Sequence, residues 1–283
     1  MKFIEAIDLI FKYKTYVSEK EKPEEKTVLK DISLTIHRGD FVGILGHNGS
    51  GKSTLAKQLT ALLKPTGGAV YIKGMDSSSS LNTIPIRKTA GIVFQNPDNQ
   101  LIGNIVEEDI AFGPENLGVP TEEIWDRVGA ALEATGMSAY RLSSPHALSG
   151  GQKQKIAISG ILAMEPECIV LDEPTAMLDP VGREEVRKAI RSLNQERNIT
   201  IIYITHHVDE VKEADYLYVM NQGRIVMEGK PESLWKQTEQ WKDYGMRLPF
   251  IQRLIAHLRE KGMDIPDDIS SEKDLFAYLC QNL

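Results

Sequence analysis

Several features that would assign this sequence to a class of protein are absent. No run approaches the roughly 20 apolar residues that a helix needs to span a bilayer, and the start, Met1 to Glu5, lacks the continuous apolar stretch of a signal peptide. Only two cysteines occur, Cys168 and Cys280, and neither lies in a Cys-x-x-Cys pair. We therefore expect a cytosolic protein with reduced thiols, in which any path across a membrane is formed by another chain.

The sequence also lacks an excess of positive charge. Its 33 Lys and Arg residues face 40 Asp and Glu residues, which gives a formal net charge of -7. Nucleic-acid partners require a basic surface, so this balance predicts no nucleic-acid partner. With 283 residues, of which 41% are hydrophobic and 26% charged, the chain can bury a sizeable core in one large or two smaller domains.

Apolar runs of strand length alternate with helical patterns along most of the chain. Strands are expected at residues 32–36, 40–45, 91–94, 168–171 and 199–204. Helices are expected at residues 53–63, 183–194 and, with interruptions, 101–164. Residues 216–228 predict a β-hairpin that turns at Gln222-Gly223. Strands that alternate with helices predict an α/β fold with a mainly parallel sheet.

Proline, glycine and charge mark the breaks in these patterns. The mainly helical region is expected to break at Gly113-Pro114, Val119-Pro120 and Ser144-Pro145. Residues 18–26 carry charges of both signs and a proline, which predicts a solvated hairpin loop.

The segment after Lys230 differs in composition and predicts a small helical appendage. It contains Trp235 and Trp241, followed by Phe250, Leu254 and Leu258 at helical spacing. Ser271 is a candidate cap for a last short helix that contains Leu275 and Leu279.

A glycine-rich segment, Gly46-His-Asn-Gly-Ser-Gly-Lys-Ser53, lies between an expected strand and an expected helix and matches the pattern G-x-x-x-x-G-K-[ST]. Glycines allow successive backbone N–H groups to point at one anion, and the helix N-terminus adds partial positive charge. Lys52 would reach the outer phosphates of a nucleotide, and Ser53 would ligate magnesium. The alternative, an ordinary glycine-rich turn, is disfavoured by the order strand, loop, helix. The candidate ATP-binding residues are Gly46, His47, Asn48, Gly49, Ser50, Gly51, Lys52, Ser53 and Thr54.

The apolar strand expected at residues 168–171 runs directly into two carboxylates, Asp172 and Glu173. Asp172 is a candidate ligand that holds magnesium through water. Glu173 is a candidate for the residue that orients an attacking water and partly deprotonates it. Alone, an apolar run that ends in Asp-Glu is often only a strand entering a polar loop, so this interpretation depends on the phosphate-binding loop upstream.

The pentapeptide Leu148-Ser-Gly-Gly-Gln152 lies between these two elements. Ser-Gly-Gly at a helix start offers N–H donors and a hydroxyl to an anion, although the same residues also cap helices that bind no ligand. In this order the three elements resemble the ATP-hydrolysing subunits of ABC transporters, and the resemblance covers about Phe3 to Gly229. It implies that the ATP of a partner subunit is bound by Ser149, Gly150, Gly151 and Gln152.

This resemblance implies a P-loop NTPase fold of the ABC ATPase type. Such a fold has a RecA-like parallel sheet core, an antiparallel β subdomain and an α-helical signature subdomain, here expected at about residues 98–165. The nucleotide-binding domain is expected to span residues 1–229. Residues 230–283 would form the C-terminal helical appendage, which is a candidate dimer contact.

Further residues resemble the remaining motifs of this family. Gln95 follows a short strand, like the glutamine that touches metal and water and senses the membrane partner. Asp179 ends Ala-Met-Leu-Asp, which resembles the D-loop that crosses the dimer interface. His206 resembles the switch histidine that contacts the terminal phosphate, and the adjacent His207 is disfavoured because His206 directly follows Thr205.

Tyr13 resembles the aromatic residue that stacks on adenine, with Phe11 and Tyr16 as alternatives. The resemblance further implies ATP and Mg²⁺ as cofactors and a dimer in which each ATP lies between the phosphate-binding loop of one subunit and the signature of the other. ATP binding would close the dimer, and hydrolysis would open it.

Narrower features resemble the ATPases of energy-coupling factor (ECF) transporters, which import vitamins and metal ions. These are Phe94-Gln-Asn-Pro-Asp-Asn-Gln100, the signature helix that continues to Lys155, and the tail around 248–262. Lys155 stands where arginine is more usual, so a bidentate contact is not expected there. Met177 in the D-loop and the tail favour the first of the two ATPase paralogues that such systems often contain.

The resemblance implies three kinds of partner and a peripheral position at the cytoplasmic face of the cell membrane. The partners are a second ABC ATPase subunit, a transmembrane coupling protein and a small membrane protein that captures substrate. A heterodimer of paralogues is favoured for the ATPase pair, and a homodimer stays open. Residues 96–118 are expected to form a groove for a helix of the membrane partner, with Leu101, Ile102 and Ile105 either lining it or filling the core.

Other readings of the same motifs are less well supported. An ABC ATPase that acts on DNA would carry a long coiled coil between Gln95 and Ser149, where no heptads occur. A ribosome-associated factor would carry two sets of motifs, and a non-hydrolysing module would commonly lack Glu173 or His206. The ATPase of another ABC importer class stays open.

Overall fold

A parallel sheet forms the centre of the computed structural model, which describes residues 1–15, 24–266, 269 and 272–282. In this sheet the described strands follow the order β10-β9-β3-β8-β7-β6. Neighbours are parallel except β9 and β10, which form the predicted hairpin. The strands are β3 (Phe41–Gly46), β6 (Ala90–Val93), β7 (Cys168–Asp172), β8 (Thr200–Thr205), β9 (Tyr216–Asn221) and β10 (Arg224–Gly229).

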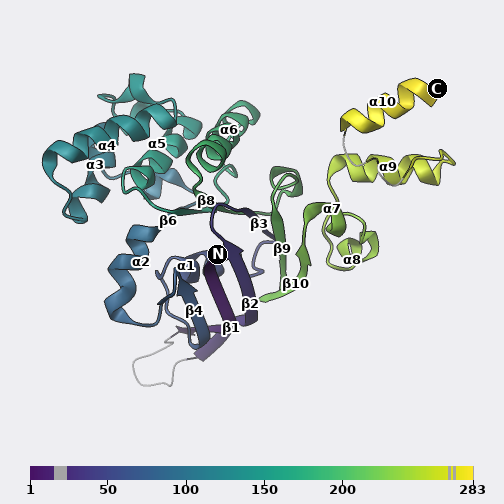
Figure 1. Cartoon of the computed structure of the whole chain (residues 1–283), viewed down its shortest axis with the longest axis horizontal. Helices are drawn as coiled ribbons and strands as arrows, with labels where there is room; N and C mark the ends of the chain where they lie inside the picture. The colour runs from purple at the N-terminus through teal and green to yellow at the C-terminus, as the bar shows by residue number, and fades with distance from the viewer. Residues whose placement is uncertain (16–23, 267–268, 270–271, 283) are drawn as a thin grey trace.

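An antiparallel sheet lies against one face of the central sheet, below it in Figure 1. Its described strands are β1 (Lys2–Thr15), β2 (Glu24–His37), β4 (Gly67–Ile72) and β5 (Met75–Asp76), in the order β2-β1-β4-β5. Ile32, Leu34 and Ile36 point inward and are buried, as their alternation predicted. Of the charged loop predicted over residues 18–26, residues 18–23 lie outside the described residues, and residues 24–26 belong to β2.

Helix α1 (Lys52–Leu59) lies between the two sheets and contacts strands of both. The helix predicted over residues 53–63 is therefore too long. It ends because Ala61 takes a left-handed φ of 51°, while the N–H groups of Leu62 and Leu63 return to the carbonyl oxygen of Lys57 at 2.9 and 3.1 Å. Helix α2 (Thr83–Thr89) follows β5 after the short turn η1 (Ser80–Asn82).

A helical lobe covers the other face of the sheet at the end near β6, in the upper left of Figure 1. It contains α3 (Val106–Asn116), α4 (Thr121–Ala134) and α5 (Gly150–Leu162). The short turn η2 (Pro97–Asn99) precedes α3, and the turns η3 (Ser138–Tyr140) and η4 (Pro145–Ala147) lie between α4 and α5. Helix α3 does not break at Gly113-Pro114, contrary to the prediction. Pro114 lies in the last turn, so only the hydrogen bond to Ile110 is lost.

Helix α6 (Pro180–Arg197) packs beside this lobe. Along the central strands, alternate side chains point into two separate hydrophobic cores. Phe41 and Leu45 belong to the core under the helices, whereas Val42 and Ile44 belong to the core between the sheets. The expected parallel α/β architecture is thus confirmed. None of the described helices is long and apolar enough to cross a bilayer.

The tail forms short helices at the opposite end of the molecule, on the right in Figure 1. They are α7 (Pro231–Leu234), α8 (Thr238–Asp243), α9 (Phe250–Glu260) and α10 (Glu272–Asn282). Trp235 and Trp241 belong to the core of the preceding domain, with ring centroids 5.1 Å apart. A separate small core first appears at Ile251 and Ile255, which pack with residues of α10.

Residues of the predicted tail helices contribute unequally to that small core. Leu254 and Leu258 pack against it partly buried, whereas Phe250 is 56% exposed. Leu275 is buried and Leu279 packs beside it, as expected for the last helix. Ser271, the predicted cap, lies outside the described residues.

Candidate nucleotide-binding site

The predicted site residues gather where four parallel strands end at one edge of the central sheet. Strands β3, β7 and β8 are adjacent, and β6 lies beside β7. The glycine-rich loop follows β3, Asp172 ends β7, His206 follows β8, and Gln95 follows β6. Carboxyl ends of parallel strands meet at the same edge, which brings together residues that are far apart in the sequence.

The phosphate-binding loop wraps around the side chain of Lys52. The Lys52 side chain is 4% exposed, and its ammonium donates to the carbonyl oxygens of Gly46 (2.8 Å) and His47 (3.1 Å). A Cβ atom at Gly46 would lie 2.5 Å from the carbonyl oxygen of Met220, so a larger residue would not fit there. Gly51 has a φ of 103°, a left-handed conformation that favours glycine directly before the helix.

Two oxygen-bearing side chains meet at the start of α1. The Ser53 hydroxyl donates to Asp172 Oδ1 at 3.1 Å, across the gap between the loop and β7. Burial raises the pKa of Asp172, and the nearby Glu173 charge adds to this, while the Ser53 hydrogen bond and Lys52 act in the opposite direction.

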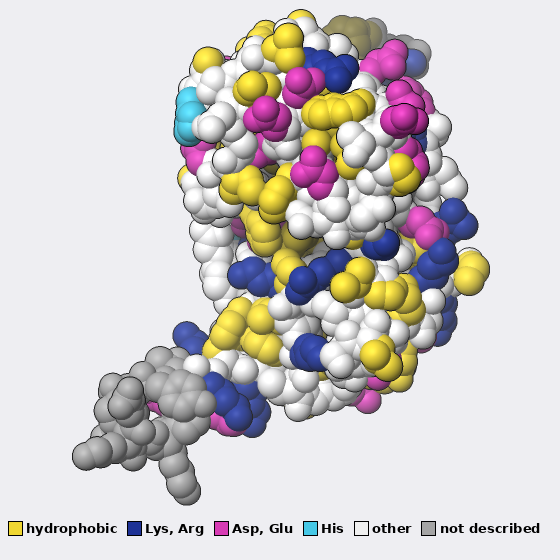
Figure 2. Space-filling model, turned by 90° about the vertical axis from the view of Figure 1, so that its left-hand side faces the viewer, with side chains coloured by type: hydrophobic (Ala, Val, Ile, Leu, Met, Phe, Trp, Pro, Cys, Tyr) yellow, Lys and Arg dark blue, Asp and Glu magenta, His cyan; other side chains and the backbone are white. Residues whose placement is uncertain are grey.

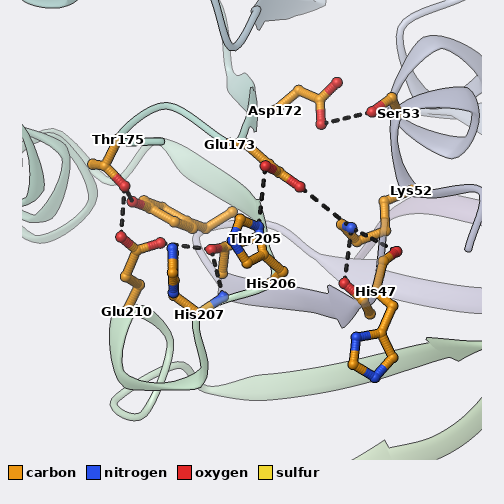
Figure 3. A network of polar contacts seen from close by, with 12 residues as sticks. His47, Lys52, Ser53, Asp172, Glu173, Thr175, Thr205, His206, His207 and Glu210 are labelled. Atoms are coloured by element: carbon orange, nitrogen blue, oxygen red, sulfur yellow. Dashed lines mark hydrogen bonds and ion pairs between the residues drawn. The ribbon is translucent and has the colours of Figure 1, made fainter. Parts of the chain in front are cut away.

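Glu173 joins Lys52 to His206 (Figure 3). Glu173 Oε1 lies 3.3 Å from Lys52 Nζ, and Glu173 Oε2 lies 3.1 Å from His206 Nδ1. Glu173 has a left-handed φ of 50°, which is strained for a side-chain-bearing residue and common at functional sites. A base, a cation and an imidazole thus converge at one point, an arrangement able to act on a phosphate ester and an attacking water.

The structure distinguishes the two adjacent histidines. His206 points toward Glu173, whereas the His207 ring lies on the side of Glu210 (Figure 3). Burial lowers the pKa of His207, and the nearby His206 adds to this lowering. Of the two rings, that of His206 contacts Glu173.

A cavity of about 650 Å³ opens beside these residues. Tyr13, Gln95, Lys52 and Glu173 all line it. Tyr13 is 38% exposed, its hydroxyl lies 3.5 Å from Thr54 Oγ1, and its ring packs edge-on against Phe11. Phe11 itself is buried, and Tyr16 lies outside the described residues.

The signature residues do not line this cavity. Ser149 caps α5 in a capping box, in which its hydroxyl accepts from Gln152 N–H (3.3 Å) and Gln152 Oε1 accepts from Ser149 N–H (2.9 Å). Gly151 lies so close to Gly182 of α6 that an added Cβ would be 3.2 Å from the Gly182 Cα atom. Within the single chain, these residues stabilise the start of α5.

The D-loop also has a local structural role. Asp179 accepts a hydrogen bond from Gly182 N–H at 3.0 Å and caps α6. Met177 is exposed, whereas Leu178 is buried. Lys155, the departure noted in the signature helix, makes one ion pair with Glu185 at 2.9 Å.

Sequence reasoning missed several residues at this site. The cavity is also lined by Lys26, Thr27, Val28, Lys30, Gln222 and Gly223. Gly223 N–H donates to the carbonyl oxygen of Ser50 at 2.9 Å, so the β9–β10 turn supports the phosphate-binding loop. His47 Nε2 lies 3.0 Å from the carbonyl oxygen of Tyr244, which links this loop to the tail. No local motif signals these contacts, because they join segments distant in the sequence.

Comparisons with known proteins agree with this geometry. Residues 29–176, more than half of the chain, match the ABC transporter family, and residues 249–283 match the EcfA1 C-terminal domain of energy-coupling factor transporters. The EcfA1 ATP-binding protein of Caldanaerobacter subterraneus subsp. tengcongensis is 55% identical over 90% of this chain and 92% of its own length. The EcfA1 ATP-binding protein of Clostridium perfringens is 51% identical over 98% of both chains.

Solved structures lead to the same group. The structure of cbiO1 from Clostridium perfringens, part of the ABC transporter complex cbiONQ, has a TM-score of 0.75 and 37% identity over 90% of this chain and all of that chain. A dimeric ATP-binding cassette in a post-hydrolysis state, bound to ADP and phosphate, has a TM-score of 0.70 and 29% identity over 81% of this chain and 98% of its own.

The chain therefore belongs to the ABC transporter ATPases and, among them, to the EcfA1 ATP-binding subunits of energy-coupling factor transporters. It binds and hydrolyses ATP.

Proposed function

We propose that this chain energises the import of a micronutrient, a vitamin or metal ion, through an ECF-type membrane complex. The observation that carries this proposal is the match of residues 249–283 to the EcfA1 C-terminal domain, beyond the part common to ABC ATPases. The high identity to EcfA1 proteins over nearly the full chain supports it. The chain would act at the cytoplasmic face of the cell membrane as a peripheral subunit.

Within the site, we assign each role to the residue whose position favours it. Lys52 and the backbone of residues 46–54 would bind the phosphates, because the loop surrounds a buried ammonium. Glu173 would orient and partly deprotonate the attacking water, and His206 would contact the terminal phosphate. Their 3.1 Å contact supports a shared task at one reacting group.

The residues fit a magnesium ion. Ser53 and Asp172 place two oxygen atoms 3.1 Å apart, and Gln95 lines the same cavity. The described residues contain no group of three or more His, Cys, Asp and Glu side chains able to hold a metal. Few protein ligands suit Mg²⁺, which usually keeps several waters and is bound with substrate phosphates. Bound there, the ion would neutralise charge on the phosphates during transfer.

Tyr13 is our candidate for stacking on adenine. It lines the cavity and keeps part of its ring exposed, while Phe11 is buried in the core. An exposed aromatic face can stack on a base without loss of core packing.

We further propose that the site is completed by a second ATPase subunit. Ser149, Gly150, Gly151 and Gln152 lie outside the cavity of their own chain, which supports a role toward the ATP of a partner. Asp179 would lie at the dimer interface, and the related cassettes solved as dimers support such an assembly. A paralogue is the favoured partner, and a second copy is the alternative.

We propose a boundary between the two domains from how the tail packs. A division at residues 229 and 230 separates the last strand from the tail helices. Trp235 and Trp241 pack into the nucleotide-binding domain, however, so the independently packed part of the appendage would begin near Ile251.

The membrane partner would dock in an apolar groove between the helical lobe and α2. A cavity of about 390 Å³ there is lined by Leu101, Phe112, Ile161 and Met164, with Arg87 and Asp109 among its polar residues. Figure 2 shows apolar side chains in the hollow of this face and Lys and Arg side chains across the region below it. An apolar floor with charged edges fits one face of an amphipathic helix. Of the residues predicted to line the groove, Leu101 does so, whereas Ile102 is exposed outside it.

A cysteine at Asn99 is expected to crosslink to the copurified membrane subunit. Asn99 is exposed beside the groove, whereas Gln100 is a poorer site because its side chain accepts from Phe94 N–H at 2.7 Å. The background should carry Cys280→Ser, because Cys280 is exposed while Cys168 is buried. Glu196→Cys, exposed on α6 and outside the groove, is the matched control. A product with Glu196→Cys but none with Asn99→Cys, read by denaturing gel, would contradict this docking site.

Copurification tests the proposed function as a whole. The tagged chain, expressed in its native host and extracted gently in detergent, is expected to bring down a related ATPase, a transmembrane coupling protein and small membrane proteins, all identified by mass spectrometry. Large permease subunits with a soluble binding protein would instead indicate another ABC importer class. Recovery without any membrane protein would contradict a role in transport.

A further inference from the structure

A buried carboxylate lies behind the proposed catalytic pair and takes no part in the roles assigned so far. Glu210 ends the short turn η5 (Val208–Glu210) and is 5% exposed. Its two oxygens accept from different segments, Oε1 from the Thr175 hydroxyl at 2.5 Å and Oε2 from the Thr205 hydroxyl at 2.6 Å. Figure 3 shows this second cluster beside the contacts of Glu173 and His206.

The two threonines are close in sequence to the two members of the pair. Thr175 lies two residues after Glu173, and Thr205 directly precedes His206. One side chain thus joins the segment that carries the proposed base to the segment that carries the proposed switch histidine. The same segments meet again where Glu173 N–H donates to the Ile204 carbonyl oxygen at 2.9 Å.

The donors around Glu210 are arranged in two chains that both end on its carboxylate. His207 N–H donates to Thr205 Oγ1 at 2.9 Å, so the Thr205 hydroxyl proton is available to Glu210. The Tyr203 hydroxyl lies 3.4 Å from Thr175 Oγ1 and can donate to it. Burial, with the Glu210 charge second, raises the pKa of Tyr203, which keeps that hydroxyl protonated.

Such support is needed because Glu173 has a strained backbone. Left-handed φ values in residues with side chains persist only where the surroundings fix them. Arg183 Nε, 3.9 Å from Glu210 Oε1, adds a nearby positive charge from the first turn of α6, after the D-loop. A carboxylate that is buried, charged and bonded on both oxygens holds its neighbours more rigidly than a neutral group would.

We propose that Glu210 is a positioning residue for ATP hydrolysis, whose buried carboxylate ties Thr175 to Thr205 and thereby fixes Glu173 against His206. This inference rests on the proposed roles of Glu173 and His206 and deepens them. Glu210 does not contact the nucleotide cavity, so it affects the chemical step rather than ATP binding.

The test is steady-state ATP hydrolysis by the full-length chain and its isosteric variants. In Glu210→Gln, one hydroxyl faces an amide NH₂ instead of an acceptor, and kcat is expected to fall about 10- to 100-fold through misplacement of the pair. The KM for ATP and the affinity for a fluorescent ATP analogue are expected to change less than about twofold, since the phosphate-binding loop is untouched. Thr175→Val and Thr205→Val each remove one of the two hydroxyls. When either is combined with Glu210→Gln, the loss of kcat in the double variant should be smaller than the product of the two single losses.

Two controls separate positioning from general destabilisation. Glu213→Gln removes the same charge three residues away, where the exposed Glu213 pairs with the half-buried Arg191 at 2.7 Å, and should leave kcat unchanged. Val186→Ala opens the core on α6 and should lower Tm while kcat stays within about twofold. A kcat loss in Val186→Ala equal to that in Glu210→Gln at the same Tm would overturn the inference.

Glu173→Gln separates failure of this inference from failure of the proposed function. Full turnover in Glu210→Gln, or in both threonine variants, beside an inactive Glu173→Gln would overturn the positioning role alone. Full turnover in Glu173→Gln itself would overturn the assigned catalytic pair and this inference with it.

Discussion

Replacement of Glu173 by glutamine is expected to lower ATP turnover by about 100- to 1000-fold while ATP binding is retained. Glutamine keeps the shape of the side chain but cannot take a proton from water. It also removes a negative charge 3.3 Å from Lys52 Nζ, which leaves that ammonium free to bind phosphate. The variant should therefore accumulate as a closed, ATP-bound dimer, seen by size-exclusion chromatography with ATP, and release little phosphate.

Glu196→Gln is the matched control for this experiment, because it makes the same chemical change at an exposed position near the end of α6. Its turnover and its ATP-dependent elution should equal those of the unsubstituted chain. Normal phosphate release by Glu173→Gln would refute the assignment of Glu173 as the catalytic base.

Replacement of Lys52 by alanine is expected to weaken ATP binding by about 10- to 100-fold, which corresponds to the loss of a hydrogen bond to a charged group. The ammonium is buried beneath the loop that it holds through Gly46 and His47. Its removal takes away the positive charge for the phosphates and also leaves the Glu173 carboxylate without its cation, a second source of repulsion. Isothermal titration calorimetry with ATP measures the effect directly.

Lys188→Ala serves as the control for the loss of one positive charge, because Lys188 is exposed on α6. It should bind ATP as the unsubstituted chain does, and circular dichroism should show both variants folded. Unchanged ATP affinity in a folded Lys52→Ala protein would count against the phosphate-binding role of the loop.

These two variants divide the site into a binding part and a chemical part. Lys52 begins α1, directly after the loop that follows β3, whereas Glu173 follows β7 and His206 follows β8. Glu210 would connect only the latter two segments. ATP affinity and ATP turnover are therefore expected to change independently. Lys52→Ala should lower the affinity, whereas Glu173→Gln or Glu210→Gln should lower the turnover.

Much of the site could be predicted because each of its motifs is a contiguous stretch, and the residues in and around that stretch indicate the local secondary structure. The apolar run before Gly46 and the helical pattern after Ser53 placed a glycine-rich turn between a strand and a helix. By the same reasoning, two further strand ends were predicted from the apolar run that ends in Asp172 and the apolar run before His206. Parallel strands place their carboxyl ends together, so the proximity of these residues followed from the strand pattern.

Three predictions made from local patterns differ from the structure. The apolar residues Leu62 and Leu63 suggested a longer α1, but a left-handed turn at Ala61 ends the helix. Gly113-Pro114 suggested a break, yet α3 continues because its last turn loses only one hydrogen bond. Trp235 and Trp241 looked like part of a separate appendage, but they pack into the core of the nucleotide-binding domain.

The sequence by itself determined the class of fold, the family and the candidate residues for ATP and magnesium, because those depend on short stretches whose spacing is fixed along the chain. Only the tertiary structure decided that the β9–β10 turn supports the phosphate-binding loop, that His47 reaches the tail at Tyr244, and that Glu210 joins Thr175 to Thr205. Each of these contacts brings together segments from separate elements. A hydrogen bond between them depends on how sheets and helices pack, which no local pattern encodes.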